Sequence, residues 1–431
     1  MKKTKSIMEM IKQKECVVGV IGLGYVGLPL AITLANKGFK VIGYDIDKHK
    51  INKLLNSENY INDIKTSDLK TALQNKLFIP INDSNELKQT NIIVVCVPTP
   101  LNKKRKPDLT YLKQAAEIVS QNIKKNHVII FESTTYPGTT EKLLKKIIEK
   151  SGLNALDDFF LSFSPERIDP SNKYYNVNNT PKIVGGIDKE STQVTAYFYQ
   201  SIIDSDVIKV TNTKTAEMAK ILENTYRLIN IALIFEMSEI CNKLKIDIWE
   251  VIDAAKTKPY GFQAFYPGPG VGGHCIPIDP IYLSHEMKKH KYKTKLIDIS
   301  NKIVLNMPNY IVNRIKNITK NHKLNNLKIL LIGMSYKKDV DDLRESPSLE
   351  LFKILQEKKA QVDYYDPYID SFTFNKKQYK SVAINKIKQY DLVVICVDHN
   401  NLNYKYILDN SKLIFDLKNV YQNNKKKVIK L

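Results

Sequence analysis

The sequence predicts an α/β protein in which two Rossmann-like, doubly wound domains are joined by a long central helix. Short apolar runs rich in β-branched residues alternate with amphipathic stretches at both ends of the chain, the pattern of βαβ units around a buried parallel sheet. A glycine motif follows the first apolar run, and residues 213–245 contain neither Gly nor Pro.

The bulk composition is that of a globular protein. The chain has 431 residues, 43% of them hydrophobic and 26% charged, which is enough for two or three domains. Its five cysteines are scattered without a CxxC pair, which argues against a disulfide framework or a zinc site and fits a reducing compartment. The sequence therefore predicts a cytoplasmic protein without a bound metal.

The net charge of +21 is spread along the chain and suits polyanionic ligands such as nucleotides. We expect no nucleic-acid partner, because no nucleic-acid-binding motif is present and the basic residues do not interleave with aromatic ones. The uncharged run 16–35 is nearly long enough to span a membrane. It contains several glycines and Pro29 and leads directly into a second strand, so it predicts a strand, a turn and a helix rather than an anchor.

The first domain is predicted over residues 1–212, with parallel strands joined by helices. Its expected strands are 16–24, 40–45, 91–99, 127–134, 159–167 and 182–186.

The central domain is predicted over residues 213–318. At 1.5 Å per residue its first helix would be ~50 Å long. A helix of that length needs cover from both domains or from a partner subunit, and this favours a homodimer. The third domain, 319–431, returns to the βα pattern near residue 327, and its strands faintly repeat those of the first.

The motif "GLGYVG" predicts a dinucleotide site. It places Gly22, Gly24 and Gly27 between an apolar strand and a helix-compatible run, and Asp45 ends the next strand at the roughly 20-residue distance of this fingerprint. Gly22 would permit the tight turn, Gly24 the approach of the pyrophosphate, and Gly27 close packing of the helix.

Asp45 would bind a ribose hydroxyl and favour NAD over NADP, although Lys48 and Lys50 would suit a phosphate there. Hydroxyl side chains follow two further strands, where they either line the nicotinamide end or simply cap the strands. The predicted NAD site includes Tyr25, Val26, Lys50, Thr99, Ser133 and Thr134.

The stretch "YPGPGVGGHCIPIDP", residues 266–280, predicts a nucleophile. Cys275 lies on a loop whose glycines let another molecule approach the backbone, whereas the other four cysteines lie within predicted strands or the long helix. A thiolate adds readily to an aldehyde carbonyl. Together with NAD, this predicts oxidation of an aldehyde through a thiohemiacetal and a thioester that is then hydrolysed.

Six motifs in order make the chain resemble the UDP-glucose/GDP-mannose dehydrogenase family from about residue 15 to 420. Two of them look most similar to UDP-N-acetylglucosamine 6-dehydrogenases of bacterial surface-polysaccharide pathways, which implies capsule or O-antigen synthesis. The motifs are "GLGYVGLPLA", "ESTTYPGTTE", "FSPERIDP", "KILENTYRLINIAL", "GPGVGGHCIPIDP" and "KKDVDDLRESP".

The resemblance implies a four-electron oxidation of a nucleotide sugar at C6, with Cys275 as nucleophile. It implies that Lys220 stabilises the alkoxide and oxyanion, that Asn224 donates a hydrogen bond, and that Asp279 assists deprotonation. Thr134 and Glu166 would position the water and the thioester. Without the resemblance, Lys220 and Asn224 also fit a solvated helical pair, and Asp279 a turn residue.

In the third domain Gly333 is not followed by a glycine triplet, so we do not expect this half to bind a second NAD. The resemblance implies that it binds the UDP moiety, with Lys337 or Lys338 pairing with the phosphates. A solvated charge run is the alternative interpretation for its "YKKDVDDLRE" segment. Arg344 would reach the cofactor. The implied sugar-nucleotide contacts are Glu166, Arg167, Lys220, Asn224, Tyr266, Gly268, Gly270, Gly272, Lys337 and Lys338.

We therefore expect an NAD-dependent UDP-N-acetyl-D-glucosamine 6-dehydrogenase. The cysteine loop differs from the "GFGGSCFQKD"-like loop of UDP-glucose enzymes, but UDP-GalNAc, UDP-ManNAc and UDP-glucose remain open as substrates. A two-electron β-hydroxyacid or 6-phosphogluconate-type dehydrogenase shares this architecture and needs no thiol. A non-enzymatic nucleotide- or RNA-binding protein is the alternative from another class.

Overall fold

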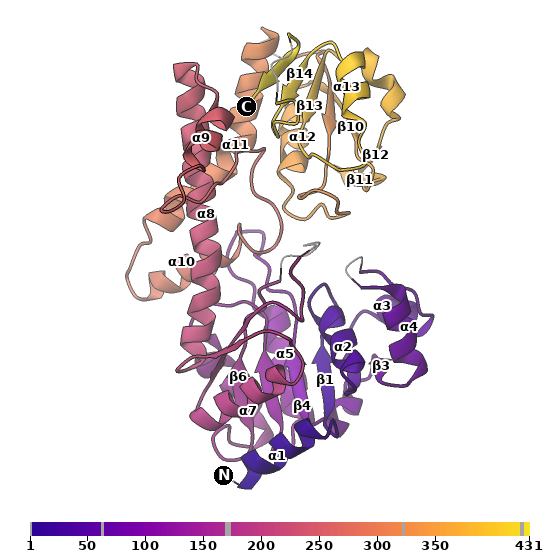
Figure 1. The fold of residues 1–431 in the computed structure, drawn as a ribbon, viewed down its shortest axis with the longest axis vertical. Helices are drawn as coiled ribbons and strands as arrows, with labels where there is room; N and C mark the ends of the chain where they lie inside the picture. Colours follow the sequence, from indigo (N-terminus) through magenta and orange to yellow (C-terminus); the bar gives the residue numbers. More distant parts are fainter. Residues whose placement is uncertain (1, 62–63, 169–173, 321–323, 423–425) are drawn as a thin grey trace. The chain divides into compact units, whose positions relative to one another are not determined.

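The computed structural model describes residues 2–61, 64–168, 174–320, 324–422 and 426–431. The chain divides into two compact units, the first ending at Glu223 and the second beginning at Asn224. This boundary falls within helix α8 (Thr213–Leu244), so the predicted long central helix is confirmed almost to the residue (Figure 1). Residues 169–170 of the "FSPERIDP" motif lie outside the described residues.

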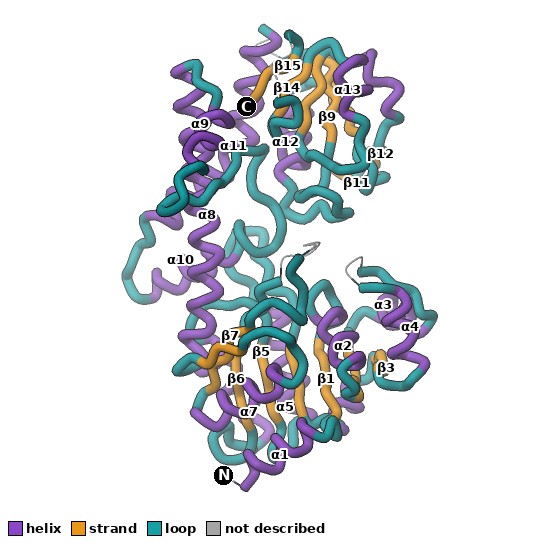
Figure 2. The backbone as a smooth tube through the Cα atoms, viewed as in Figure 1, coloured by secondary structure: helices purple, strands orange, loops and turns teal. Residues whose placement is uncertain are grey.

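The first unit is built on an eight-stranded sheet in the order β3-β2-β1-β4-β5-β6-β7-β8, as far as the chain is described (Figure 2). The order reverses between β1 and β4, which is where doubly wound sheets bind their ligands. The expected strands are confirmed, β7 with the predicted bounds and the others in shortened form, while β3 and β8 were not expected. The strands are β1 (Val17–Ile21), β2 (Lys40–Tyr44), β3 (Phe78–Ile81), β4 (Ile92–Val95), β5 (Val128–Phe131), β6 (Phe160–Phe163), β7 (Lys182–Gly186) and β8 (Val207–Lys209).

One strand departs from the expected parallel arrangement. β7 pairs antiparallel with β6, with Phe163 opposite Gly185, so the parallel assignment of residues 182–186 was wrong. A parallel crossover needs a connection that carries the chain back along the sheet, usually a helix. No helix is assigned among the described residues between β6 and β7.

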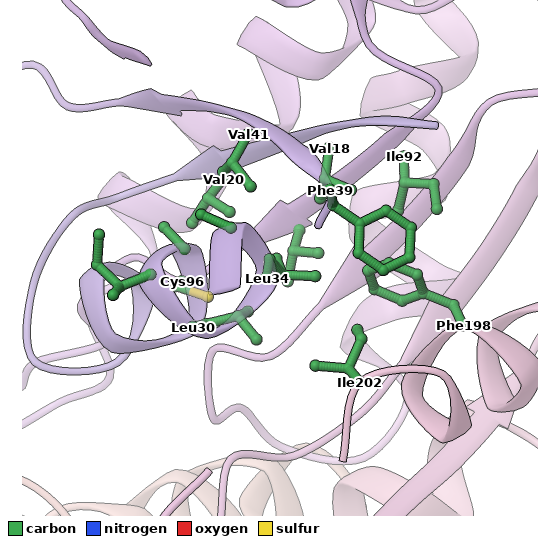
Figure 3. Packing of buried hydrophobic residues seen from close by; sticks show 14 of the residues in the cluster. Val18, Val20, Leu30, Leu34, Phe39, Val41, Ile92, Cys96, Phe198 and Ile202 are labelled. Atoms are coloured by element: carbon green, nitrogen blue, oxygen red, sulfur yellow. The ribbon is translucent and has the colours of Figure 1, made fainter. Parts of the chain in front are cut away.

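Helices cover both faces of this sheet. Phe39 and Phe198 meet edge to face at 6.0 Å between ring centroids, within a core that includes Val18, Leu34 and Ile92 (Figure 3). The helices are α1 (Lys2–Lys12), α2 (Gly27–Asn36), α3 (Lys48–Leu55), α4 (Thr66–Gln74), α5 (Thr110–Asn122), α6 (Lys145–Ile148) and α7 (Lys189–Gln200).

The second unit has a five-stranded parallel sheet in the order β10-β9-β13-β14-β15 in the described chain, with an additional hairpin formed by β11 and β12. The last half of α8 packs into its core through Leu228 and Phe235. The strands are β9 (Lys328–Ile332), β10 (Gln361–Tyr365), β11 (Ser371–Phe374), β12 (Lys377–Lys380), β13 (Leu392–Ile395), β14 (Ile414–Asp416) and β15 (Val428–Lys430); the helices are α9 (Ile248–Ala255), α10 (Asp279–Lys289), α11 (Leu296–Thr319), α12 (Pro347–Glu357) and α13 (Tyr404–Asn410).

Among the described residues, none of the helices combines the length and the apolar character that a membrane span requires.

Candidate active site

The turn between β1 and α2 forms a cradle that only glycine permits. Gly22 has a φ of +93°, and a Cβ added to Gly27 would lie 1.8 Å from the carbonyl oxygen of Gly22. At Gly24, by contrast, an added Cβ would meet no heavy atom within 4 Å, so the backbone there is open to a ligand. The first turn of α2 contains no acidic residue. This fits a dinucleotide whose pyrophosphate lies at the positive end of a helix.

Asp45 lies beside this cradle, directly after β2, and is 6% exposed. Its Oδ2 accepts hydrogen bonds from the N–H of Leu23 at 2.9 Å and from Lys50 Nζ at 3.0 Å. Its Oδ1 accepts from the N–H of Asp47 at 2.9 Å. The carboxylate thus fixes the turn that carries the glycines, and Lys50 pairs with the same oxygen that bonds the turn.

The remaining predicted cofactor residues of this unit lie at the carboxyl edge of its sheet or at the start of α2. Ser133 is buried, and its hydroxyl accepts from the N–H of Val97 at 2.9 Å, which matches the strand-capping interpretation. Thr99 and Thr134 are half-buried on the loops that follow the paired strands β4 and β5. Tyr25 is 39% exposed, and Val26 is the N-cap residue of α2.

Glu166 lies after β6 and uses both of its carboxylate oxygens. Oε1 accepts from the N–H groups of Arg167 and Ile168 at 2.7 and 2.8 Å, and Oε2 accepts from Lys182 Nζ at 3.1 Å. Burial acts to raise its pKa, but the charge of Lys182 and the two amide donors hold the pKa of Glu166 below its usual range. Arg167 is turned to Glu223, at 2.8 Å.

Sequence reasoning did not identify Lys182 or its second partner, Glu132. Lys182 Nζ lies 2.6 Å from Glu132 Oε1 and is almost fully buried. The only signal in the sequence is a lysine at the start of an otherwise apolar strand, and such a residue is common on exposed strand ends.

The first part of α8 holds the loop that carries Thr134. Glu217 is fully buried, and its carboxylate accepts from the N–H groups of Gly138 and Thr140 and from the hydroxyl of Thr140. Burial raises the pKa of Glu217 to about 7. Lys220 lies one turn further along this helix and is 7% exposed. Sequence reasoning identified Lys220 but not Glu217.

In the second unit, Cys275 lies on the turn that leads into α10. Its side chain is exposed, while the other four cysteines are buried and none of the five forms a disulfide. Its carbonyl oxygen accepts from the N–H of Asp279 at 2.8 Å. Burial raises the pKa of the Cys16 and Cys396 thiols to about 12. Cys275 is therefore the thiol best placed to act as a nucleophile.

Asp279 is the first residue of α10 and is buried, as is Asn224 on α8. The side-chain amide of Asn224 donates to Asp279 Oδ2 at 2.6 Å. The structure thus brings these two predicted residues together, although they lie far apart in sequence. Asp279 is not the turn residue of the alternative interpretation.

The glycines of the cysteine loop have a packing role of their own. A Cβ on Gly270 would lie 2.8 Å from Pro347 Cβ, and one on Gly272 would lie 2.6 Å from Tyr336 Cβ. Only at Gly268 is the nearest atom as far as 4.0 Å, the Nζ of Lys418. The predicted contact of Gly270 and Gly272 with the sugar nucleotide stays a prediction. Close packing against Pro347 and Tyr336 is a second reason for glycine at these two positions.

Tyr266, at the start of the same loop, stacks on Trp249 with 5.8 Å between ring centroids. Lys337 and Lys338 follow β9 and are both half-buried. Lys338 Nζ lies 3.3 Å from Asp398 Oδ2. Arg344 binds Asp342 through its Nε and Nη2, with a shortest distance of 2.6 Å.

A carboxylate also accepts backbone N–H groups of the turn after β9, as Asp45 does in the turn after β1. Asp366 Oδ2 accepts from the N–H groups of Met334 and Ser335, and it lies 3.3 Å from His399 Nε2. Asp366 is only 2% exposed. Asp366 is thus as enclosed as its counterpart in the first unit, and whether this half binds a dinucleotide stays a prediction.

The described residues include no group of three or more His, Cys, Asp or Glu side chains arranged to hold a metal ion. The first unit thus offers a turn suited to a dinucleotide and a buried glutamate, Glu217. The second unit offers the exposed thiol of Cys275 and the buried carboxylate of Asp279.

The chain is similar to known proteins over most of its length. The NAD binding, central and UDP binding domains of the UDP-glucose/GDP-mannose dehydrogenase family match residues 16–203, 214–304 and 330–423, respectively. The UDP-N-acetyl-D-glucosamine 6-dehydrogenase of Pseudomonas aeruginosa is 33% identical over 96% of this chain and 99% of its own length. The UDP-N-acetyl-D-mannosamine dehydrogenase of Methanococcus vannielii is 34% identical over 96% and 95%. The solved structure of the UDP-D-ManNAc dehydrogenase of Pyrococcus horikoshii has a TM-score of 0.87 at 31% identity, covering 96% of this chain and 98% of that one.

Proposed function

The chain belongs to the UDP-glucose/GDP-mannose dehydrogenase family of NAD-dependent nucleotide-sugar dehydrogenases, and from that premise we propose that it oxidises the C6 hydroxyl of UDP-N-acetyl-D-glucosamine to the carboxylate. The observation that carries the four-electron chemistry is the exposed thiol of Cys275 on a glycine-rich turn, where every other cysteine is buried. A two-electron dehydrogenase has no use for such a thiol.

The identity of the sugar rests on the relatives and on the cysteine loop. Relatives named for the N-acetylglucosamine and N-acetylmannosamine nucleotides are equally similar to this chain. UDP-N-acetyl-D-mannosamine is therefore the second candidate, supported also by the name of the similar solved structure. The UDP moiety is assigned to the second unit, where the match to the UDP binding domain lies.

The first unit would hold NAD through the Gly22–Gly27 turn and Asp45. When bound, NAD supplies the hydride acceptor for both oxidations, so one sugar and one water yield one carboxylate, two NADH and three protons. In the second stage the Cys275 thiolate adds to the C6 aldehyde carbon and gives a thiohemiacetal. Loss of the C6 hydride, for which a second NAD would be the acceptor, converts this adduct into a thioester. Water then attacks the thioester carbonyl, which gives the carboxylate and releases the Cys275 thiolate.

The other side chains have roles in charge and proton transfer. The buried ammonium of Lys220 stabilises the alkoxide and the oxyanion, with Asn224 as a hydrogen-bond donor. Asp279 accepts the proton of the alcohol or of the attacking water. Thr134 and Glu166 orient that water. The structural support is the burial of Lys220, Asn224 and Asp279 and the hydrogen bond between the last two. Thr134 and Glu166 are half-buried.

Assembly and cellular role are part of the same proposal. In the second unit, α8 exposes the large apolar side chains of Tyr226, Leu233, Ile240 and Leu244. A second copy of the chain would cover this surface, giving a homodimer. The enzyme would act in the cytoplasm and supply uronic acid nucleotides for capsule or O-antigen synthesis.

One assay tests the proposed function. NADH formation is followed by absorbance with UDP-GlcNAc, UDP-ManNAc, UDP-GalNAc, UDP-glucose and GDP-mannose, and NADH is divided by sugar consumed. Two NADH per UDP-GlcNAc, with the highest kcat/KM in the panel, is the expected result. One NADH per substrate would indicate a two-electron dehydrogenase. No NADH together with tight, salt-dependent RNA binding would indicate the non-enzymatic alternative.

A further inference from the structure

The antiparallel strand β7 brings a lysine to the edge of the sheet where ligands bind. Because β7 runs opposite to β6, its first residue, Lys182, lies at the carboxyl end of β6. Glu166 follows β6, and Glu132 follows the neighbouring strand β5. A parallel β7 would have placed Lys182 at the opposite edge.

Lys182 joins these two glutamates in a buried network. Its Nζ lies 2.6 Å from Glu132 Oε1 and 3.1 Å from Glu166 Oε2, and its side chain is 4% exposed. The same ammonium lies 4.6 Å from the centroid of the Tyr199 ring. The Tyr199 hydroxyl donates to Glu132 Oε1, and Cys96 Sγ donates to Glu132 Oε2 at 3.7 Å. Glu132 is thereby fixed on both oxygens.

The two carboxylates differ in their surroundings. The side chain of Glu132 is fully enclosed, whereas that of Glu166 keeps 11% of its surface exposed. Burial raises the pKa of Glu132, while Lys182 and two backbone amides hold the pKa of Glu166 low. The two carboxylates raise the pKa of Lys182 despite its burial, so the lysine stays charged. The carboxylate with the lowered pKa is therefore the one that reaches solvent.

We propose that Lys182 is a positioning residue for the reaction, which keeps Glu166 ionised and fixes its orientation while Glu132 and Tyr199 hold the ammonium. This inference rests on the proposed function, in which Glu166 orients the water that attacks the thioester. A buried ion pair contributes little net stability compared with an apolar replacement. The network is therefore better explained by the state of Glu166 than by stability alone.

The test compares four variants with the wild type. Lys182→Met removes the charge but keeps the length of the side chain, Lys182→Arg keeps the charge, and Glu132→Gln removes the competing carboxylate. Lys37→Met is the matched control, because Lys37 forms a surface ion pair with Asp204 at 2.9 Å. Urea unfolding of each variant separates loss of folded protein from loss of function.

For the catalytic readout, thioester hydrolysis is followed in single turnovers across pH 5 to 9. Lys182→Met is expected to slow hydrolysis at least tenfold at pH 7, with little change in KM. The acidic limb of its pH–rate profile should move to higher pH. Lys182→Arg should keep most of the wild-type rate, and Glu132→Gln should move the acidic limb to lower pH. Equal losses in all three variants without any shift of the profile would overturn the inference.

A second readout does not depend on turnover. In protein labelled with [5-¹³C]glutamate, the carboxyl signal of Glu166 is assigned by its disappearance in Glu166→Gln, and its titration is followed by NMR. The midpoint should rise in Lys182→Met and not in Lys37→Met. An unchanged midpoint would refute the role of Lys182 even if the enzyme is active. A shifted midpoint in a protein that oxidises no sugar would leave this charge control standing and reject the proposed function.

Discussion

The side-chain amide of Asn224 donates a 2.6 Å hydrogen bond to Oδ2 of Asp279, and the two side chains are 4% and 3% exposed. Asp279 is the first residue of α10, where the helix dipole favours a negative charge. Its own N–H donates to the carbonyl oxygen of Cys275. These contacts hold a buried carboxylate in one orientation, one helical turn beyond the proposed nucleophile.

If Asp279 is the proton acceptor, Asp279→Asn should lower kcat by about 10² to 10⁴-fold, the range typical of general acid–base catalysis. The KM for the UDP-sugar should change little, since the asparagine keeps the shape of the side chain. Steady-state kinetics with both substrates varied measures the two parameters. A kcat within threefold of the wild type would remove Asp279 from the mechanism.

Asn224→Ala leaves the buried carboxylate without this donor, which should cost roughly 1–3 kcal/mol of stability. Asn242→Ala is the matched control, because Asn242 lies exposed on the same helix. Urea denaturation of both variants measures the difference. Equal effects of the two substitutions would mean that the bond does not contribute to stability.

The five cysteines should differ sharply in their reaction with iodoacetamide. Cys275 is exposed, whereas the other four are buried, and burial raises the pKa of the Cys16 thiol to about 12. We expect one label per native chain at pH 8, located on Cys275 by peptide mass spectrometry, with slower labelling in the presence of the UDP-sugar. Labelling of several cysteines at similar rates in folded protein would contradict the structure.

Glu217 should make stability depend on pH. Its pKa in the folded state is about 7, against an ordinary value of 4.5, so between these values the folded state binds a proton that the unfolded state does not. Stability contributed by this group is therefore lost as pH rises through that window. The advantage of the wild type over Glu217→Gln should fall by on the order of 3 kcal/mol between pH 5 and 8. Urea unfolding at several pH values checks this, and a constant difference would refute it.

Asp45 should determine which dinucleotide binds. Asp45→Asn removes the charge that repels a 2′-phosphate while Lys50 stays in place, so the preference for NAD over NADP should fall about 10- to 100-fold. The ratio of kcat/KM for the two cofactors measures this, with Lys40→Ala, at the exposed start of β2, as control. An unchanged ratio in Asp45→Asn would mean that another group distinguishes the ribose 2′-hydroxyl of NAD from the 2′-phosphate of NADP.

Local patterns were sufficient to predict the strands near the dinucleotide site. β1 and its glycines follow from an apolar run and a fixed spacing, and the steric demands at Gly27 are local to the turn. The direction of β7 was not predictable in this way. An apolar run shows that a strand forms but not which neighbour it pairs with or in which direction. The expectation of a parallel strand therefore placed Lys182 at the wrong edge of the sheet.

The resemblance to a family brought Asn224 and Asp279 into one set, and the structure adds the hydrogen bond between them. No local pattern connects two residues this far apart in sequence. At the glycines of the cysteine loop, the structure adds a different explanation for the sequence pattern. Closely spaced glycines are typical of a backbone that a ligand approaches, but Gly270 and Gly272 also pack against Pro347 and Tyr336, where a side chain would not fit.

The proposed reaction passes through a covalent bond between the sugar and the Cys275 sulfur. Enzyme mixed with NAD and UDP-GlcNAc is quenched in acid at successive times, digested and analysed by mass spectrometry, with Glu166→Gln included to slow hydrolysis. We predict a hydroxylamine-sensitive UDP-uronyl adduct on the Cys275 peptide that forms and decays at rates matching uronate production. Uronate that accumulates at the normal rate without any adduct on this peptide would contradict the proposed mechanism.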